Sequence, residues 1–422
     1  MSSFLRWGLR IFNSLGPRRL LAAIALLLCY GSIQRAPVYT GGTLSITTGT
    51  GPYIGGSPID IQTSGGRGKV AVSIIGPGDY ISGVYHPPVL AKPTNATIVA
   101  ATPFAYATRE LQLVPPPPPG ANIIAVASYG SGIALHDAST FALIGIVPSA
   151  EPPGDVAIAP NGDIYAPLTD ATTMLAVTRS PWSVGKLDDV PLGNEIVIDP
   201  GDGAMFVSNR DVDGKGALTR VAGGVTRRII TGITAEGLAL DSRGHHIFVG
   251  NVNEDVVLEV DTRTMEPVAR IASVPRTFGI ALDDDARNLF VVSNQNRHMR
   301  PGGGYLARID LRTQQGRIAA RSGNMPFPVG VAYDAKTNAV FVADEDSDQV
   351  YVLDAQTLAP RHAPLKACAL PWRPHIDERQ RRLYVPCAKA NRIAAYNLDT
   401  LSQLRGSPFA TGNYPLGVAT SN

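Results

Sequence analysis

The 422-residue sequence is poor in cysteine, in charged side chains and in aromatic side chains. It contains 3 cysteines, 17% charged residues and 7% aromatic residues. Three cysteines are too few for a disulfide-rich scaffold. No helical periodicity is sustained after the first thirty residues, which argues against a helical bundle. The sequence also lacks a basic stripe with interleaved aromatic residues, so we expect no nucleic-acid partner.

Glycine and proline, in contrast, are abundant, with 43 and 34 residues. Together with many Val, Ile and Thr residues, they favour short strands joined by tight turns. The chain is longer than a typical single domain, so two domains or one large repeat array are expected. The predicted fold class is therefore all-β.

Residues 1–31 are typical of an export signal. Four arginines and no acidic residue precede the apolar run Leu20–Leu28. This run is too short for a settled transmembrane helix, which needs about 20 apolar residues, although an uncleaved membrane anchor is the alternative. Loss of the four arginines would turn the formal net charge from +2 to −2. We expect an exported bacterial protein, located in the periplasm, in the medium or at the cell surface.

Residues 38–114 contain short alternating segments separated by Gly, Pro and Asn, such as Val70–Ile75 and Thr108–Val114. This pattern predicts a small β-sandwich, which resembles the immunoglobulin-like modules of bacterial surface proteins. Five consecutive prolines follow, and such a run is stiff and extended. Residues 115–120 are therefore predicted to be a linker.

From residue 121 onward the sequence repeats itself. A short apolar phrase that ends in a polar residue, such as Leu238–Asp241, is followed by a second phrase such as Ile247–Asn251. The second phrase occurs seven times, but only six complete first phrases lie between these copies. The missing one is Pro415–Thr420 at the C-terminus. A period of about 40–45 residues with four strands per unit is typical of a β-propeller. We predict a seven-bladed β-propeller over residues 121–422, closed by the C-terminal strand.

Two segments resemble the repeats of the YVTN family of propellers: IFVGNVNEDVVLEVDTRT (Ile247–Thr264) and VFVADEDSDQVYVLDAQT (Val340–Thr357). In that family an aromatic-Val-x-Asn phrase precedes a Val-x-Val-Ile-Asp-x-x-Thr phrase, and the chain is also similar to the related NHL propellers. The Asp-x-x-Thr spacing predicts turns held by the Asp side chain. The resemblance implies a propeller but leaves the activity open, because this fold hosts binding modules, scaffolds and hydrolases.

The familiar catalytic motifs are missing, so any functional site is expected where a propeller forms a pocket, near its central channel. One face of a propeller carries the connections between blades and the loops that join the second strand of each blade to the third. We call this face the top face. His375, Arg373 and Asp377 lie on the first strand of the seventh blade, where they could polarise a carbonyl or activate water. A hydrogen-bonded histidine among the inner strands is the alternative.

Other candidates lie in top-face loops. Arg297, His298 and Arg300 belong to a long glycine-flanked insertion that suits a binding loop, although a neutral insertion is the alternative. Trp372 and Phe327 could stack on a sugar or peptide, or simply fill the space between blades. The Asp344, Asp346 and Asp348 spacing could bind calcium, but the glycine and glutamate of a calcium loop are missing, which favours a solvated turn. No cofactor is expected, and calcium is the alternative that this spacing leaves open.

Cys368 and Cys387 are the only cysteines after residue 31. Both are predicted on the top face, and export would place them where disulfides persist, so we expect them to pair.

The predicted function is an exported binding or scaffolding module. It would act at the cell envelope by binding a protein or an envelope polymer through its top face. Membrane contact is expected only through an uncleaved N-terminal anchor. The alternative is a hydrolase of lactonase type, since some seven-bladed propellers with similar repeats open lactone rings. The lack of a convergent catalytic set favours binding over catalysis. A deep channel in which His375, Arg373 and an acid meet would favour the hydrolase.

Overall fold

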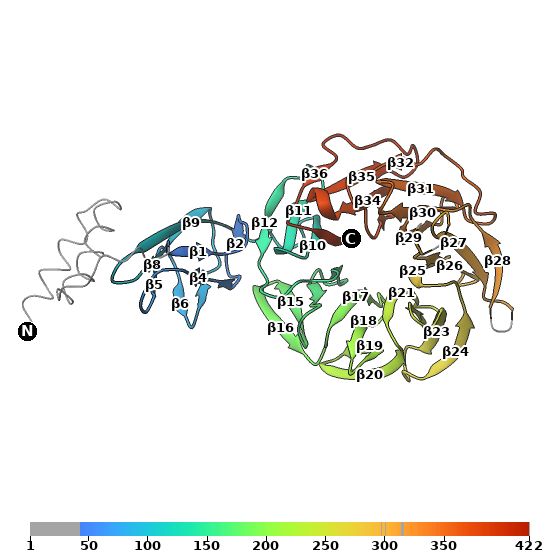
Figure 1. The fold of residues 1–422 in the computed structure, drawn as a ribbon, viewed down its shortest axis with the longest axis horizontal. Helices are drawn as coiled ribbons and strands as arrows, with labels where there is room; N and C mark the ends of the chain where they lie inside the picture. Colours follow the sequence, from blue (N-terminus) through green and yellow to red (C-terminus); the bar gives the residue numbers. More distant parts are fainter. Residues whose placement is uncertain (1–42, 297, 300, 314–315, 422) are drawn as a thin grey trace, which may run out of the picture.

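The computed structural model describes residues 43–296, 298–299, 301–313 and 316–421 (Figure 1). The predicted export signal, Arg297 and Arg300 therefore lie outside the described residues. The described part of the chain is built of strands, with one short 3-10 helix, η1 (Ala388–Ala390). Within that part, no helix is long and apolar enough to cross a membrane. The all-β fold class is confirmed.

The first domain is a small β-sandwich. Its core contains Leu44, Tyr53, Ile59, Tyr85 and Ile98, which are all buried. Three groups of hydrogen-bonded strands surround this core: β1 with β4, β3 with β7 and β6, and β2 with β9, β8 and β5. The strands are β1 (Ser45–Thr47), β2 (Tyr53–Ile54), β3 (Ile59–Asp60), β4 (Gln62–Ser64), β5 (Ala71–Ile75), β6 (Asp79–Ile81), β7 (Val84–His86), β8 (Thr94–Ala101) and β9 (Tyr106–Val114).

The remaining strands form seven blades arranged around a central axis (Figure 1). The first strand is innermost in blades 2 to 7, and the C-terminal strand is innermost in blade 1. Blade 1 contains β10 (Ile123–Ser128), β11 (Gly132–Asp137), β12 (Leu143–Val147) and the C-terminal β37 (Pro415–Thr420). Blades 2 to 4 contain β13 (Ala157–Ile158), β14 (Ile164–Pro167), β15 (Thr173–Arg179) and β16 (Trp182–Asp188); β17 (Gly193–Ile198), β18 (Met205–Val212), β19 (Lys215–Ala222) and β20 (Val225–Gly232); and β21 (Ala235–Asp241), β22 (His246–Asn251), β23 (Val256–Asp261) and β24 (Pro267–Ala272).

Blades 5 to 7 complete the ring. They contain β25 (Thr277–Leu282), β26 (Asn288–Ser293), β27 (Tyr305–Asp310) and β28 (Arg317–Arg321); β29 (Pro328–Asp334), β30 (Ala339–Asp344), β31 (Gln349–Asp354) and β32 (Leu365–Lys366); and β33 (His375–Asp377), β34 (Arg382–Cys387), β35 (Arg392–Asn397) and β36 (Phe409–Ala410).

The C-terminal strand closes the ring as predicted. Strand β37 pairs antiparallel with β10, with Val418 opposite Val126 and Ala419 opposite Ala125. It therefore serves as the innermost strand of blade 1, next to strands from the start of the propeller. This pairing removes the free sheet edge that an open array of blades would leave.

The predicted Asp-x-x-Thr turns are also confirmed. The side chains of Asp137, Asp261 and Asp354 each accept a hydrogen bond from the backbone N–H of the Thr three residues later, at 2.8, 2.8 and 2.9 Å. The Ser139 and Thr140 hydroxyls also donate to Asp137, and these bonds lower the pKa of its carboxyl to about 2. These turns lie on the bottom face, opposite the connections between blades.

The first domain and the propeller share one sheet. Strand β2 pairs with β12 at Tyr53 and Ile146, so blade 1 continues through β2 into β9, β8 and β5. The backbone N–H of Ile146 donates to Pro52 O at 2.8 Å. The proline linker is bonded too, because the Arg179 guanidinium donates to the carbonyl oxygens of Pro118 and Ala121 at 3.0 and 3.1 Å. The linker is therefore attached to blade 2 rather than acting as a free spacer.

Candidate functional site

The inner strands differ from blade to blade at one position at the top of the channel. In blade 4 this position is Gly237, directly before Leu238, which pairs with Val249 of the second strand. In blade 3 it is Glu195, directly before Ile196, which pairs with Val207. Four blades have glycine at this position and three have a charged residue. By strand register the glycines are Gly417, Gly237, Gly279 and Gly330 in blades 1, 4, 5 and 6, and the charged residues are Asp155, Glu195 and Arg373 in blades 2, 3 and 7.

Close packing explains the glycines. A Cβ atom on Gly237 would lie 2.3 Å from the carbonyl oxygen of Phe278, and one on Gly279 would lie 2.6 Å from that of Val329. Backbone atoms cannot move aside as a side chain can, so neighbouring inner strands approach this closely only without a side chain.

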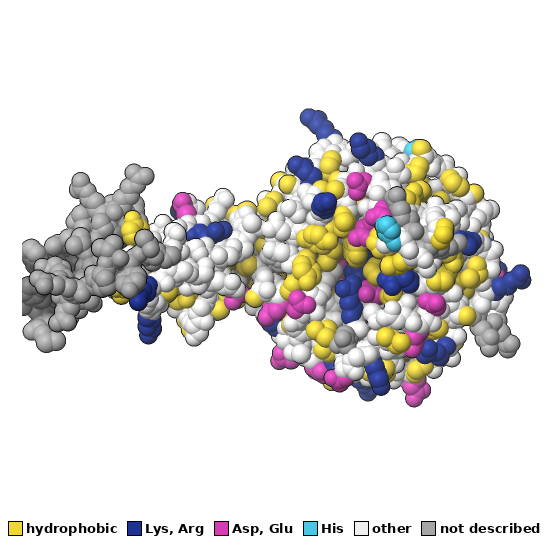
Figure 2. Space-filling view, in the orientation of Figure 1, with side chains coloured by type: hydrophobic (Ala, Val, Ile, Leu, Met, Phe, Trp, Pro, Cys, Tyr) yellow, Lys and Arg dark blue, Asp and Glu magenta, His cyan; other side chains and the backbone are white. Residues whose placement is uncertain are grey.

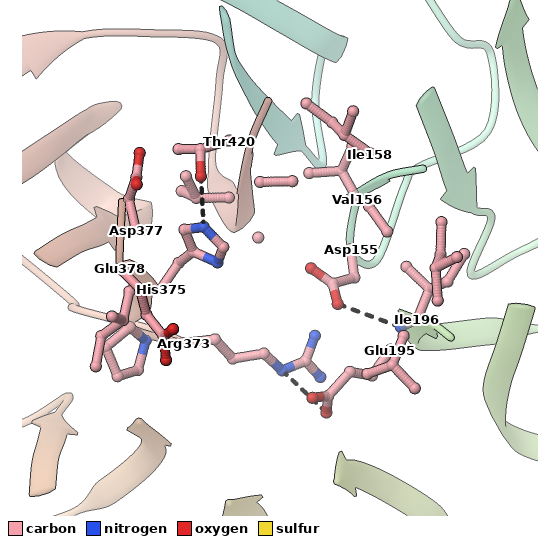
Figure 3. A pocket seen from close by; sticks show the side chains of 18 of the residues that line it. Asp155, Val156, Ile158, Glu195, Ile196, Arg373, His375, Asp377, Glu378 and Thr420 are labelled. Atoms are coloured by element: carbon pink, nitrogen blue, oxygen red, sulfur yellow. Dashed lines mark hydrogen bonds and ion pairs between the residues drawn. The ribbon is translucent and has the colours of Figure 1, made fainter. Parts of the chain in front are cut away.

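Blades 2, 3 and 7 carry side chains at this position, and a cavity of about 920 Å³ lies against them. It is lined by the inner strands of these three blades and by β37. Asp155, Glu195 and Arg373 lie at its top end, while Glu378 and Arg379 come from the turn after β33 at its bottom end. Figure 3 shows Arg373 extending across the cavity toward Glu195, and Asp155 lies on the same side of the cavity as Glu195. In Figure 2, basic and acidic side chains lie next to each other in the middle of the ring.

Arg373 is the centre of a buried ionic cluster. Its Nε lies 3.7 Å from Glu195 Oε2, its Nη2 lies 3.9 Å from Glu236 Oε2, and its Nη1 donates to Gly154 O at 3.3 Å. The three charged side chains are only 13%, 17% and 6% exposed. Burial by itself would lower the pKa of Arg373, but Glu195, Asp155 and Glu236 outweigh it and raise the pKa. Arg373 therefore remains charged.

Further groups support the cluster from blade 3. Glu236 Oε1 lies 2.9 Å from Arg210 Nε, and Glu236 Oε2 accepts a hydrogen bond from the Asn194 amide at 2.6 Å. Asp155 accepts a hydrogen bond from the backbone N–H of Ile196 at 3.2 Å. The cluster thus joins two arginines and three carboxyl groups from blades 2, 3, 4 and 7.

Two of these carboxyl groups have raised pKa values. Burial raises the pKa of Glu195 to about 8, with Arg373 opposing the shift and Asp155 and Glu236 adding to it. Burial also raises the pKa of Asp155, against the charge of Arg373. Near neutral pH, Glu195 can therefore hold a proton within reach of the cavity.

His375 lies in the same cavity, below Arg373. One of its ring nitrogens, Nε2, is hydrogen-bonded to Thr420 Oγ1 at 3.1 Å (Figure 3). Burial lowers its pKa to about 4, although nearby Asp377 opposes this shift. The imidazole is therefore neutral near pH 7. Other blades carry Ala239, Ala281 and Ala332 at this position, so His375 is specific to blade 7.

The predicted grouping of His375, Arg373 and Asp377 is only partly brought together. All three line the cavity, but Asp377 accepts a hydrogen bond from the Gln380 backbone N–H at 2.8 Å, in the turn at the bottom end. The acids that face Arg373 are instead Asp155 and Glu195, which the sequence analysis missed. Alignment of the repeats would have revealed them, because both replace glycine at the position described above.

The turn that the sequence favoured at Asp344–Asp348, over a calcium loop, is held by hydrogen bonds to the backbone. The Asp344 carboxylate accepts hydrogen bonds from the backbone N–H groups of Phe327 and Ser347 at 2.7 and 2.9 Å, and Asp348 accepts one from Leu370 at 3.0 Å. Among the described residues, no group of three or more His, Cys, Asp and Glu side chains is arranged to hold a metal ion.

Asp348 has counterparts in other blades that explain its role. Asp255 and Asn391 each accept a hydrogen bond from the backbone of the following blade connection, from Arg276 at 2.8 Å and Tyr414 at 2.9 Å. Asp255, Asp348 and Asn391 all have positive φ, which short Asx side chains tolerate. Asp348 is therefore part of the repeat's turn structure.

Of the two aromatic candidates, Trp372 packs against neighbouring blades. Trp372 meets Phe278 edge-on, with ring centroids 6.0 Å apart, and packs against a cluster of Val252, Phe278, Val329 and Ala343. Phe327 is partly buried, and its backbone is held by Asp344. His298 is exposed on the insertion between β26 and β27, apart from these contacts.

A disulfide joins Cys368 to Cys387 within blade 7, with their Cα atoms 5.5 Å apart. It links the connection that leads into blade 7 to the end of β34, close to Trp372 and Arg373 in the sequence.

Comparison with known proteins supports the fold. No protein-family model and no curated protein sequence matches the chain. Similar solved structures include hydrazine synthase of Kuenenia stuttgartiensis, with a TM-score of 0.58, 16% identity, and coverage of 66% of this chain and 93% of that chain. A putative 6-phosphogluconolactonase of Bacteroides fragilis has a TM-score of 0.58 and 9% identity, covering 73% and 100%. The periplasmic gluconolactonase PpgL of Pseudomonas aeruginosa has a TM-score of 0.57 and 11% identity, covering 71% and 99%. At these identities the likeness establishes the β-propeller fold alone.

Proposed function

We propose that this protein is a binding module that recognises a protein or a cell-envelope polymer at the top face of its propeller. The Arg373 cluster and the cavity below it form the centre of that face. The observation that carries the proposal is the replacement of glycine by Asp155, Glu195 and Arg373, which line one cavity from blades 2, 3 and 7.

This replacement is hard to explain by stability. Burying several charges costs free energy that their mutual attraction offsets only in part, and well-packed apolar residues often do as well or better. Glycine at the same position lets the other inner strands pack closely. Concave sites in which a few fixed polar groups give orientation and specificity are, by contrast, common in ligand recognition.

A binding experiment with isolated envelope polymers tests this proposal. Protein that starts at residue 32 would be mixed with peptidoglycan sacculi or with immobilised lipopolysaccharide. The combined variant Glu195→Gln and Arg373→Gln should lose binding at least about tenfold, since charge-assisted contacts would be removed. The matched control, Lys336→Gln with Asp399→Asn, removes an ion pair of 3.2 Å on the bottom face and should bind normally. Equal binding by both variants would contradict the proposal.

A hydrolase of lactonase type is the second candidate, and one observation favours it. His375, Arg373 and the acid Glu195 line one cavity, and two of the similar structures bear gluconolactonase names. Arg373 could polarise a lactone carbonyl, neutral His375 could accept a proton from water, and protonated Glu195 could donate one to the leaving oxygen.

Hydrolysis of a panel of γ- and δ-lactones, followed by pH titration, tests this second function. His375→Ala should abolish the activity, while the bottom-face control above should retain it. Absence of turnover in the wild-type protein would remove this candidate without affecting the binding proposal.

The finer assignments are proposals as well. The repeats of Ile247–Thr264 and Val340–Thr357 support membership of the YVTN type, and the first domain supports an immunoglobulin-like module. The arginine-rich start and the apolar run Leu20–Leu28 support export to the periplasm, the medium or the cell surface. Signal cleavage would be checked by N-terminal sequencing of the protein from the cell envelope and from the medium.

A further inference from the structure

The first domain has an end that lies far from the propeller. Strand β9 meets β2 at Leu113, next to blade 1, so its first residue, Tyr106, lies at the opposite end of the domain (Figure 1). We call this end the distal tip and define it as residues 65–69, between β4 and β5, and residues 102–106, which comprise the β8–β9 turn and the first residue of β9.

Two aromatic side chains project from the distal tip. Phe104 is 67% exposed and Tyr106 is 64% exposed, more than any other large hydrophobic side chain among the described residues. The turn that presents Phe104 is well ordered, because Thr102 Oγ1 accepts hydrogen bonds from the backbone N–H groups of Phe104 and Ala105 at 3.3 and 3.0 Å. A rigid turn that holds an aromatic ring in solvent has no role in the domain's own core.

Basic side chains lie beside these aromatic rings. Arg67 and Lys69 are exposed on the other loop of the tip. The two loops are adjacent, since a Cβ atom on Gly68 would lie 3.5 Å from Pro103 Cδ. Neither loop contains Asp or Glu. Figure 2 shows basic side chains in dark blue at this end of the first domain.

The chain also enters the first domain at this tip. A Cβ atom on Gly66 would lie 3.3 Å from Leu44 Cδ1, and Gly65 lies against the carbonyl of Thr43. Residue 43 is the first described residue. Fourteen residues lie between it and Leu28, the end of the apolar run, and this stretch can span at most about 50 Å. If that run is held in a bilayer, the distal tip stays close to it.

We propose that the distal tip is a membrane-contacting surface. Phe104 and Tyr106 enter the interfacial region of a bilayer, where aromatic side chains are stabilised. Arg67 and Lys69 contact anionic lipid headgroups. The attachment uses an apolar and an electrostatic contribution together, as peripheral membrane proteins do. It is independent of any partner at the top face, because the tip and the propeller lie at opposite ends of the first domain.

Vesicle flotation tests the proposal. Protein that starts at residue 32 keeps every described residue and lacks the apolar run. It should bind vesicles of phosphatidylethanolamine and phosphatidylglycerol more tightly than vesicles of phosphatidylcholine alone. The variant Phe104→Ser with Tyr106→Ser should bind at least about tenfold more weakly to both. Arg67→Gln with Lys69→Gln should lose on the order of tenfold for the anionic vesicles only.

The control variant changes Val225→Ser and Ile230→Ser, two side chains on the outer strand β20 that are 58% and 50% exposed. It should bind vesicles as the wild-type protein does. A Phe104→Trp variant adds a direct measurement of depth, because its fluorescence should be quenched by brominated lipids more strongly than that of the wild type. Failure of the wild-type protein to bind, equal loss in the control, or unchanged quenching in Phe104→Trp would each overturn the proposal.

Discussion

The inner strands of blades 4, 5 and 6 pack closely through glycine, whereas those of blades 2, 3 and 7 carry charges and border a cavity. The same repeat thus produces two environments within one ring. On the close-packed side, the top of the channel holds an apolar cluster that includes Phe278 and Val329. On the open side, Asp155, Glu195 and Arg373 form an ionic cluster. The difference shows that the residue at one position per repeat decides whether neighbouring inner strands pack closely or leave a polar cavity.

Removing the positive centre of the cluster should have the largest effect. Arg373→Met keeps most of the side-chain volume but leaves Glu195, Glu236 and Asp155 without their central partner. We expect a loss of about 3–5 kcal/mol in the free energy of unfolding, because uncompensated buried charges are costly. Urea denaturation at pH 9 would measure it, because Glu195, whose pKa is raised to about 8, is then charged.

A second variant separates charge from packing. Introduced together with Glu195→Gln, Arg373→Met should cost less than it does alone, since one carboxyl group no longer needs a partner. Equal costs in both backgrounds would show that the cluster does not act through charge.

Acid should weaken the open side through His375. The pKa of this residue is lowered to about 4 in the folded protein, against about 6.5 in an unfolded chain. Between these values the unfolded chain binds more protons, so the stability is fully present above pH 6.5 and is lost as the pH falls toward 4. His375→Ala introduces the residue that blades 4 and 5 have at this position. Between pH 7 and 4.5 the variant should lose about 2–3 kcal/mol less unfolding free energy than the wild type.

Urea denaturation at both pH values would show the difference. His136 will leave a remaining acid dependence in the variant, because burial lowers its pKa to about 4 as well. Parallel curves for wild type and variant would mean that His375 is not the group that titrates.

The close-packed side should be intolerant of side chains. Gly237→Ala places a Cβ atom 2.3 Å from Phe278 O, which forces the inner strands apart. We expect a loss of about 1–3 kcal/mol, measured as a shift in the urea midpoint. Gly185→Ala is the control, since no atom lies within 4 Å of its added Cβ. A similar loss in both variants would show that strand propensity, rather than the packing of the ring, sets the cost.

Much of the fold could be predicted from the sequence because each repeat has a recognisable local pattern of apolar and polar residues. The alternation of phrases gave the blade count, and the missing first phrase placed β37 beside β10. The shared sheet between the domains was not predictable, because it depends on two residues, Tyr53 and Ile54, that meet β12 from about ninety positions away. The bonding of the proline linker to Arg179 depends on the same long-range arrangement.

The site was less predictable for a physical reason. His375 and Arg373 stand out in the sequence, but the acidic partners of Arg373 come from blades 2 and 3, and only the closed ring brings these residues to one cavity. Asp344 and Asp348 were misleading for the opposite reason. Their spacing suits a metal loop, yet each carboxylate already accepts a hydrogen bond from a backbone N–H of a neighbouring blade connection, at Phe327 and at Leu370.

The smallest effect on stability is expected at Thr420, where the open side differs least from the other repeats. Thr420 stands in β37 where β13, β17 and β21 have Ile158, Ile198 and Leu240, and its hydroxyl bonds to His375 Nε2 at 3.1 Å. Thr420→Val keeps the shape and removes this hydrogen bond, so we expect a loss of about 0.5–1.5 kcal/mol. The loss should be at the lower end, because the cavity can supply water to the imidazole. In the His375→Ala background the same change should cost almost nothing, since the partner is gone. An equal cost in both backgrounds, measured by urea denaturation at pH 7, would mean that Thr420 acts through packing within blade 1 and not through His375.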